Sequence, residues 1–269
     1  MSIQIVNEAI GQYQISTGIT RNDLEMLAGN PKTKTIQFSR PLNYNEINLL
    51  EELIFSKRND IQLRIYGHNT DLSYIQKIPS LRKISVDCMI DSKGIETVTK
   101  LEKLEGLGVG IFNLESFDFL NDINPNLKEL YLFQTTSKKP NIGYINRFRD
   151  LEFLYLEGQQ KGIDSVSRLS KLQKIVLRSI STQSIDFLTN LQELWSVDIK
   201  LGGIKNFDAL SSLPQLKYLE LWQIRDLGDL SFVSNLITLQ NLFIQSLKQV
   251  QKLPDFTQNK SLRRIYLKI

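Results

Sequence analysis

The stretch "FLTNLQELWSVDI" (187–199) decides the fold, because it returns 45 residues later as "FVSNLITLQNLFI" (232–244). Both read Phe, aliphatic, x, Asn, Leu, x, x, Leu, x, x, aliphatic, x, Ile, with the core pattern L-x-x-L-x-L. This core recurs at steps of 21 to 24 residues. Its copies begin at Leu81, Leu104, Leu127, Leu151, Leu172, Leu194, Leu216, Leu239 and Leu262. Self-similarity at such a period indicates a solenoid of stacked repeats.

Each copy carries two apolar sets. Aliphatic residues at the fourth and sixth positions alternate with other types, which predicts a short strand with one buried face. Stretches such as "SIDFLTNL" (184–191) then place apolar residues three to four apart, which predicts a helical turn or two behind the strand. Two looser copies precede the others, with the pairs Ile36/Phe38 and Leu63/Ile65, so the count is eleven. One copy cannot bury both sets alone, and stacked copies share a core.

At these residues the chain resembles the leucine-rich-repeat family, in particular the class of about 22 residues found in phosphatase-regulator-like and internalin-like proteins. The resemblance covers residues 33–269. It implies an α/β solenoid, curved as a right-handed horseshoe, with a parallel β-sheet on the concave face and short helices or turns on the convex face. The family usually has Asn or Cys eight residues after the first Leu. This chain departs from that ladder, and we expect apolar corners instead, at Met89, Phe112, Thr135, Ile180, Gly202, Ile224 and Leu247.

The first 32 residues are predicted to form an N-terminal cap, and residues 33–269 one continuous repeat domain. Thr20 and Asp23 have the spacing of a capping box at the start of a helix, and Asn43 and Glu46 repeat that spacing before a longer one. At the other end the last strand is basic. Its cations either discourage edge pairing or dock a partner, and they are Lys260, Arg263, Arg264 and Lys268.

Composition excludes several classes of protein. The 269 residues hold 33 basic and 29 acidic side chains, and the net charge of +4 is too thinly spread for a dedicated nucleic-acid binder. The N-terminus lacks the basic start and apolar run of a signal peptide, and no 18-residue apolar stretch occurs. We therefore expect a cytoplasmic protein without a membrane segment.

The sequence offers little for catalysis. Its one cysteine, Cys88, and its one histidine, His68, are the only nucleophile–base pair available, and no orienting acid stands at motif spacing. They also leave no plausible zinc or iron–sulfur site. We expect no enzyme activity, no cofactor and no metal, and we expect Cys88 to be a small buried apolar residue.

The outward face of the predicted sheet is rich in aromatic residues. Eleven copies with outward third, fifth and seventh positions give 33 sites, and nine are aromatic, although aromatics make up only 9% of the chain. The 22 inward positions hold one aromatic residue, Phe38, so strand propensity alone does not explain the enrichment. The nine are Tyr66, Tyr131, Phe133, Phe153, Tyr155, Tyr218, Trp222, Phe243 and Tyr266.

Two clusters follow from this alignment. One joins outward residues of neighbouring copies: Glu129, Tyr131, Phe133, Phe153, Tyr155 and Glu157. The other joins Tyr218, Glu220, Trp222, Asn241, Phe243 and Gln245. Exposed aromatic rows are typical of the desolvated centre of a protein interface. The alternative is that they only pack on one another on a solvated sheet.

Three glycines at alternate positions, Gly106, Gly108 and Gly110, suggest a phosphate loop at first sight. A dinucleotide loop needs G-x-G-x-x-G, and residue 111 is Ile. The repeat places all three glycines outward on one strand, beside the strand that carries Tyr131. They form either a trough for a partner side chain or a weak strand that Tyr131 covers.

The sequence therefore predicts a non-catalytic module that binds another protein on its concave aromatic face, as an adaptor, an inhibitor or an immunity-type neutraliser. An alternative is single-stranded RNA, stacked on the aromatic rings with Arg64, Lys174 and Arg178 near the phosphates. A third reading is a structural spacer without a dedicated ligand.

Overall fold

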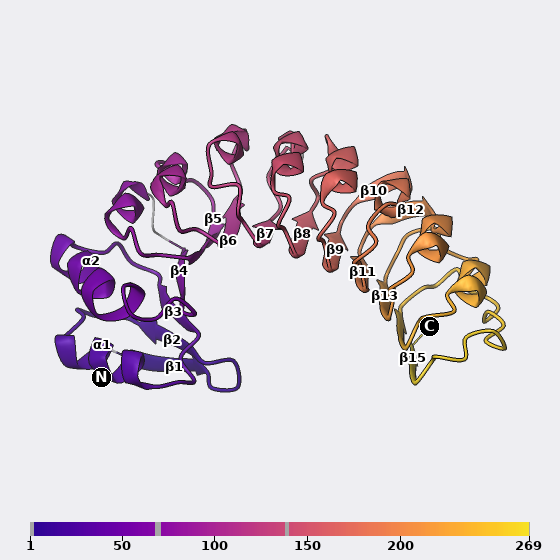
Figure 1. The fold of residues 1–269 in the computed structure, drawn as a ribbon, viewed down its shortest axis with the longest axis horizontal. Helices are drawn as coiled ribbons and strands as arrows, with labels where there is room; N and C mark the ends of the chain where they lie inside the picture. The colour runs from indigo at the N-terminus through magenta and orange to yellow at the C-terminus, as the bar shows by residue number, and fades with distance from the viewer. Residues whose placement is uncertain (1–2, 68–70, 138–139, 269) are drawn as a thin grey trace. The chain divides into compact units, whose positions relative to one another are not determined.

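The computed structural model describes residues 3–67, 71–137 and 140–268, so His68 lies outside the described residues. The chain forms two compact units. The first holds Met1–Leu127 with Thr135–Ser137, and the second holds Lys128–Gln134 with Lys138–Ile269. Within each unit, short strands line one side and short helices the other (Figure 1).

The sheet of the first unit follows the order of the chain. Its strands are β1 (Ile3–Asn7), β2 (Gln12–Ile15), β3 (Thr35–Phe38), β4 (Gln62–Tyr66), β5 (Lys83–Met89) and β6 (Gly106–Ile111). All neighbours pair in parallel except β1 and β2, which form an antiparallel hairpin at the edge. The sequence did not predict this hairpin, because residues 1–15 lack the repeat pattern. Gly11, at φ +64°, makes its turn possible.

Two helices cover the start of this unit, and both predicted capping boxes are confirmed. Thr20 caps α1 (Arg21–Gly29) with Asp23, and Asn43 caps α2 (Tyr44–Leu50) with Glu46. A π-helical turn, η1 (Glu51–Phe55), continues α2. The later repeats carry 3₁₀ turns, namely η2 (Ser73–Lys77), η3 (Ile95–Lys100) and η4 (Asp118–Asn121).

The sheet of the second unit is wholly parallel. Its strands are β7 (Glu129–Leu132), β8 (Phe153–Glu157), β9 (Lys174–Arg178), β11 (Ser196–Lys200), β13 (Tyr218–Trp222), β14 (Asn241–Gln245) and β15 (Arg264–Lys268). Two further strands, β10 (Ser181–Ser184) and β12 (Gly203–Asn206), pair on the connections that follow β9 and β11. The 3₁₀ turns are η5 (Gly143–Arg147), η6 (Ile163–Arg168), η7 (Asp186–Leu188), η8 (Asp208–Ser212) and η9 (Ser231–Asn235).

The core consists of the predicted inward aliphatic residues. On β13, Leu219 and Leu221 have no exposed surface, and neighbouring strands place aliphatic residues beside them in register. The alternation of buried and half-buried residues confirms the strand orientation derived from the repeats. Strand β15 differs, because its inward Ile265 and Leu267 stay 42% and 38% exposed.

The corners after the strands are mainly apolar, as predicted. Their buried members are Met89, Thr135, Ile180, Ile224 and Leu247. Phe112 is an exception: it is 43% exposed, and the prediction of a buried side chain there is wrong. Gly202 is required by space, since a Cβ atom would lie 2.2 Å from the carbonyl oxygen of Ile180.

A left-handed residue ends most of these strands. Four such residues lack the conformational freedom of glycine and have φ between 50° and 57°, a region that costs energy for side chains of this kind. They are Ser179, Leu201, Gln223 and Ser246. The amide of each donates to a carbonyl of the next strand, which extends the ladder by one residue. Cys88 shares this conformation and is exposed, so the prediction of a buried cysteine is wrong.

Candidate protein-binding surface

The outward face of the second unit is a regular grid. Because the strands pair one to one, the outward residues form three straight rows across β7 to β15. We call the central one the middle row, and it consists of Tyr131, Tyr155, Val176, Asp198, Glu220, Phe243 and Tyr266. Two aromatic residues stand at each end of this row, and two carboxylates stand between them.

The first aromatic cluster surrounds Tyr131. The ring centroid of Tyr131 lies 4.8 Å from that of Phe153, 6.2 Å from Tyr155 and 6.4 Å from Phe133. Phe133 and Tyr155 lie 5.2 Å apart. These distances are typical of favourable aromatic pairs, and the rings remain half-buried rather than covered. The cluster predicted from the sequence therefore forms, and it presents apolar surface on one face of the sheet.

The second aromatic cluster surrounds Phe243. Its ring centroid lies 6.5 Å from Tyr218 and 4.7 Å from Tyr266, both stacked. Trp222 stands on β13 beside this cluster, with the ammonium of Lys200 5.7 Å from its ring centroid. Tyr266, on the exposed strand β15, thus joins the group that the sequence predicted around Tyr218 and Phe243.

A charged group lies between the aromatic clusters. The Nζ atom of Lys200 contacts Asp198 Oδ2 at 2.8 Å and Glu220 Oε1 at 3.1 Å. The hydroxyl of Tyr218 donates to Glu220 Oε2 at 2.6 Å. We call these three charged residues, Asp198, Lys200 and Glu220, the central triad. Its side chains are only 16% to 21% exposed.

Asp198 is poorly satisfied in this triad. Its Oδ1 atom is buried and has no hydrogen-bond partner among the described residues. Burial raises the pKa of Asp198 to about 6; the hydrogen bond from Lys200 acts against this shift, and the charge of Glu220 adds to it. The carboxylate is therefore held in its charged form at some cost in free energy above pH 6.

The tyrosines of the first cluster are hydrogen-bond donors at any physiological pH. Burial, and then the charge of Glu129, raises the pKa of Tyr131 to about 12. Burial, and then the charge of Glu157, raises the pKa of Tyr155 to about 12. The Tyr155 hydroxyl already donates to Glu157 at 3.3 Å, and Arg178 Nε donates to the same carboxylate at 3.1 Å.

Tyr66 belongs to the first unit, in a different environment. Its hydroxyl donates to Gln14 Oε1 at 2.6 Å, and the guanidinium of Arg64 lies 4.8 Å from its ring centroid. Arg64 also donates to Asp87 Oδ1 at 2.6 Å and to Gln37 Oε1 at 2.9 Å. Because these polar groups satisfy one another, this sheet face has a closed hydrogen-bond network where the sequence predicted only an exposed tyrosine.

The glycines of β6 are buried, although Gly106 and Gly108 keep the predicted outward register, paired with Lys83 and Ser85 of β5. A Cβ atom on Gly108 would lie 2.7 Å from the hydroxyl of Ser85, on the neighbouring strand β5. Ser85 in turn donates to Asp87 Oδ2 at 2.6 Å. The space above Gly108 is thus partly taken by the polar network of β5.

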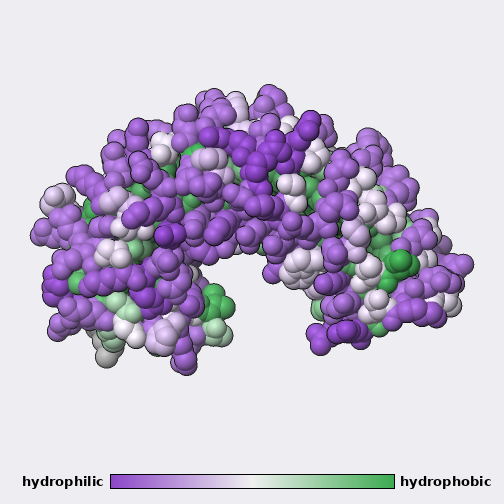
Figure 2. Space-filling view, in the orientation of Figure 1, coloured by the Kyte–Doolittle hydropathy of each residue, from purple (hydrophilic) through white to green (hydrophobic). Residues whose placement is uncertain are grey.

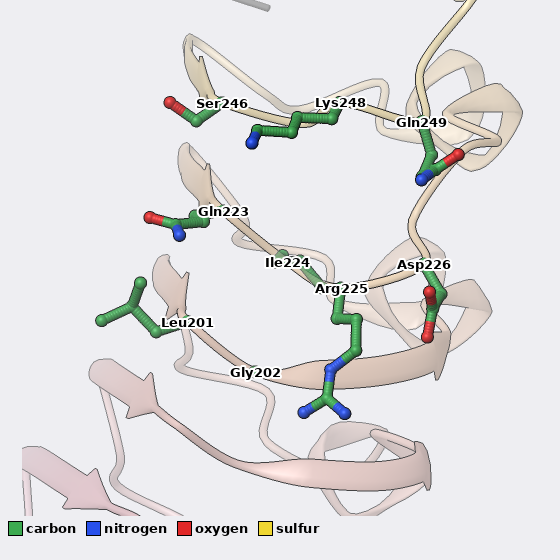
Figure 3. Close-up of a pocket in the computed structure, with 9 residues that line it drawn as sticks. All are labelled: Leu201, Gly202, Gln223, Ile224, Arg225, Asp226, Ser246, Lys248 and Gln249. Atoms are coloured by element: carbon green, nitrogen blue, oxygen red, sulfur yellow. The ribbon is translucent and has the colours of Figure 1, made fainter.

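One cavity was not predicted. It has a volume of about 370 Å³ and lies at the turns after β11, β13 and β14 (Figure 3). Figure 3 shows the side chains of Arg225 and Lys248 among those that line it, from two successive turns. No repeat pattern indicates this cavity, because the turns differ from copy to copy in length and residue type.

The described residues contain no group of His, Cys, Asp and Glu side chains fit to hold a metal ion. None of the helices within the described ranges has the length and apolar character needed to cross a membrane. Figure 2 agrees with a largely polar exterior, because hydrophilic residues dominate the visible surface of both units.

No protein-family model and no curated relative matches this sequence at a significant level. Solved structures do match. An internalin of Listeria monocytogenes is 18% identical, with a TM-score of 0.56, over 97% of this chain and 87% of that one. In the Toll–Spätzle complex of Drosophila the matched chain is 15% identical, with a TM-score of 0.66, over 98% of this chain and 38% of that one.

A third match is to the complex of the Toll-like receptor TLR13 with a single-stranded RNA. It is 20% identical, with a TM-score of 0.54, over 94% of this chain and 43% of that one. At these identities the likeness shows the fold alone. Together with the parallel sheets and 3₁₀ turns, it confirms the leucine-rich-repeat solenoid predicted from the repeats.

Proposed function

We propose that this leucine-rich-repeat chain binds another protein, without catalysis, through the outward face of its second unit. The observation that carries the proposal is the middle row, in which two half-buried aromatic clusters flank the central triad. Tyrosine, tryptophan and phenylalanine are enriched in protein interfaces, and tyrosine and tryptophan are frequent among the few residues that carry most of the binding free energy. The structural neighbours support a binding role at this coarse level.

The charges favour protein over RNA. The three cations that the RNA alternative would use are already engaged by acids or rings: Arg64 by Asp87, Arg178 by Glu157, and Lys174 by the ring of Trp195 at 4.6 Å. Phosphate binding needs concentrated and available positive charge. The carboxylates of the middle row would also repel phosphates. A protein segment that offers both apolar and polar groups fits this face better.

The size of the face indicates what it can hold. Seven strands about 4.8 Å apart span about 29 Å, which equals about nine residues of an extended segment. A partner loop or strand of this length would reach from the first aromatic cluster to the second. The turns at the strand ends enlarge the contact area toward the roughly 800 Å² per partner of a standard interface.

Affinity capture from a lysate tests the site. The wild type is compared with the triple variant Tyr131→Ala, Tyr155→Ala, Trp222→Ala, and with Tyr44→Ala as the matched control, because Tyr44 is 62% exposed on α2 of the first unit. We expect the wild type and the control to capture a protein that the triple variant does not capture. Circular dichroism must show that the triple variant is folded. Identical captures with all three proteins would contradict the proposal.

A second measurement separates protein from RNA. The affinity for a homopolymeric single-stranded RNA should fall steeply with salt if phosphate contacts dominate, whereas an aromatic protein interface should respond weakly. We expect RNA binding to be weak at 150 mM salt and unaffected by the triple variant. Tight, salt-sensitive RNA binding that the triple variant abolishes would favour RNA instead.

A further inference from the structure

The central triad is short of one positive charge. Two carboxylates, Asp198 and Glu220, share the single ammonium of Lys200, so the formal charge is −2 + 1 = −1. Glu220 has a second donor in the Tyr218 hydroxyl, but the Oδ1 atom of Asp198 has none among the described residues. A carboxylate held away from water without its full set of donors is costly, and a partner cation placed against the accessible side of the pair would offset part of this cost.

The neighbouring cations do not make up this deficit. On β9, Arg178 donates to Glu157 and is drawn toward the first aromatic cluster, and the Nζ atom of Lys174 lies over the ring of Trp195. The two basic residues of β15 lie two strands beyond Glu220, with Phe243 and Asn241 on the strand between. Although the charge of Arg178 acts on Asp198, its hydrogen bond goes to Glu157, and a bound molecule with a basic group would complete the charge of the triad.

The surroundings define the shape of that molecule. On the middle row, Val176 precedes Asp198 and Phe243 follows Glu220, so the carboxylates sit between apolar walls. With strands about 4.8 Å apart, the centre of the carboxylate pair lies about 14 Å from the centre of the Tyr131–Tyr155 pair and about 10 Å from that of the Phe243–Tyr266 pair. A cationic side chain between two apolar ones, at these separations, matches the row.

We propose that the partner segment places a basic side chain, arginine in preference to lysine, against Asp198 and Glu220, with apolar side chains on the two aromatic clusters. This inference rests on the proposed function and specifies its partner. A guanidinium has five donors in a rigid fork, so it can contact the accessible parts of both carboxylates at once and neutralise the excess negative charge of the triad. Charge-assisted hydrogen bonds of this kind are about twice as strong as neutral ones.

Other ligand charges fit less well. An acidic segment would meet the carboxylates of the middle row and gain no donor for Asp198. A divalent cation would be repelled by Lys200, whose ammonium already lies between the two acids. A neutral apolar segment would bury the unpaired carboxylate further from water and so increase its cost.

Selection from a displayed library of random 12-residue peptides tests this inference on the full chain. We expect peptides enriched in one arginine or lysine with apolar residues on both sides. A synthetic peptide from this pool is then compared with its citrulline version, which keeps the shape of arginine and removes the charge. With wild-type protein the citrulline version should bind about 10- to 100-fold more weakly, as expected for a desolvated charge pair.

Substitutions in the central triad test whether its carboxylates contact the basic side chain of the peptide. With Asp198→Asn and with Glu220→Gln, the difference between the two peptides should shrink to less than about threefold, because the paired carboxylate is gone. Asp208→Asn, on the exposed turn η8, is the matched control and should keep the full difference. An equal citrulline effect in the wild type and in both triad variants would overturn the inference.

The same peptides distinguish this inference from the proposed function. If they need Tyr155 and Phe243 but show no preference for a basic residue, the inference fails and the binding face stands. If neither Tyr155→Ala nor Phe243→Ala weakens the binding of any selected peptide, the inference and the proposed function both fail. A pool enriched in acidic residues also overturns the inference.

Discussion

Asp198 illustrates how one residue combines a structural cost with a binding role. Its carboxylate is largely buried, it has one unpaired oxygen, and it shares a cation with Glu220. Its outward position could be derived from the repeat, but its contacts could not. They depend on the side-chain conformations of Lys200 and Tyr218, which come from adjacent strands and which no spacing in the sequence specifies.

The pH dependence of stability should reveal this cost. Because folding raises the pKa of Asp198 from about 3.9 to about 6, the folded state binds a proton that the unfolded chain has lost between these values. Stability from this group is therefore present below pH 4 and lost as the pH rises to 6. We expect Asp198→Asn, relative to wild type, to gain about 1–2 kcal/mol between pH 4 and pH 7, less than the full shift because part of the side chain is solvated.

Urea unfolding at several pH values measures this difference, and a ¹³C titration of the carboxyl group gives the pKa directly. Lys200, Glu220 and Arg178 are the charged groups that act on Asp198, and they are the same in both proteins. A stability difference that stays flat between pH 4 and pH 7 would contradict the role assigned to burial.

Gly202 provides a second test at a single position. Any Cβ atom there would lie 2.2 Å from the backbone oxygen of Ile180, and a backbone atom cannot move aside cheaply. We expect Gly202→Ala to destabilise the protein by about 2–4 kcal/mol. Gly203→Ala is the control, since its Cβ atom would meet the movable Ser181 hydroxyl at 3.2 Å. Thermal unfolding of the pair measures the effect, and equal losses would refute the steric argument.

The strands of the repeats were largely predictable from the sequence, and the strands outside the repeat pattern were not. Alternation of aliphatic residues located β3 to β9, β11 and β13 to β15, because burial on a shared core imposes that period. The β1–β2 hairpin and the small β10–β12 sheet were missed. Strands β1, β10 and β12 bury few side chains, so burial imposes no repeat pattern on them, and β2 is too short, with only Tyr13 and Ile15 buried, to stand out in the sequence.

The candidate site divides in the same way. Which side chains share a face followed from the repeat, and the two aromatic clusters did form around Tyr131 and Phe243. The closed network around Arg64 and Asp87 was missed, as was the unpaired oxygen of Asp198. Hydrogen-bond pairing depends on side-chain conformation and local burial, and neither produces a periodic pattern of residue types in a single sequence.

The register of a central strand is open to a direct test. Leu219 is fully buried on β13, and truncation to alanine should lower the free energy of unfolding by about 2–5 kcal/mol. Ile237→Ala is the control, because Ile237 is 62% exposed and should contribute little. Chemical denaturation gives both values. An unchanged midpoint for Leu219→Ala would mean that the inward face has been assigned incorrectly.

Across the whole molecule, stability should vary from repeat to repeat, because each repeat is stabilised mainly by its neighbours. Leu221 and Leu267 occupy the same repeat position, but Leu221 is fully buried and Leu267 is 38% exposed. We expect Leu221→Ala to cost about 2–5 kcal/mol and Leu267→Ala less than about 1 kcal/mol.

Hydrogen exchange should show the same gradient in the wild type. Backbone amides of β15 should exchange faster than those of β13, since strands with little buried surface open at lower free energy. Equal protection of the two strands, or equal costs of the two substitutions, would show that the second unit unfolds only as one block.

The one-to-one register across β8 to β14 determines how the spacing of the outward residues changes when a repeat is gained or lost. Each step of 21 to 23 residues along the chain moves an outward residue by one strand, about 4.8 Å, without altering its height on the grid. Duplication of a single repeat between β9 and β11 would widen the gap between the aromatic clusters by one strand and leave each cluster intact. The preferred spacing in a ligand is thus encoded by the number of repeats, and it can lengthen or shorten only in whole steps.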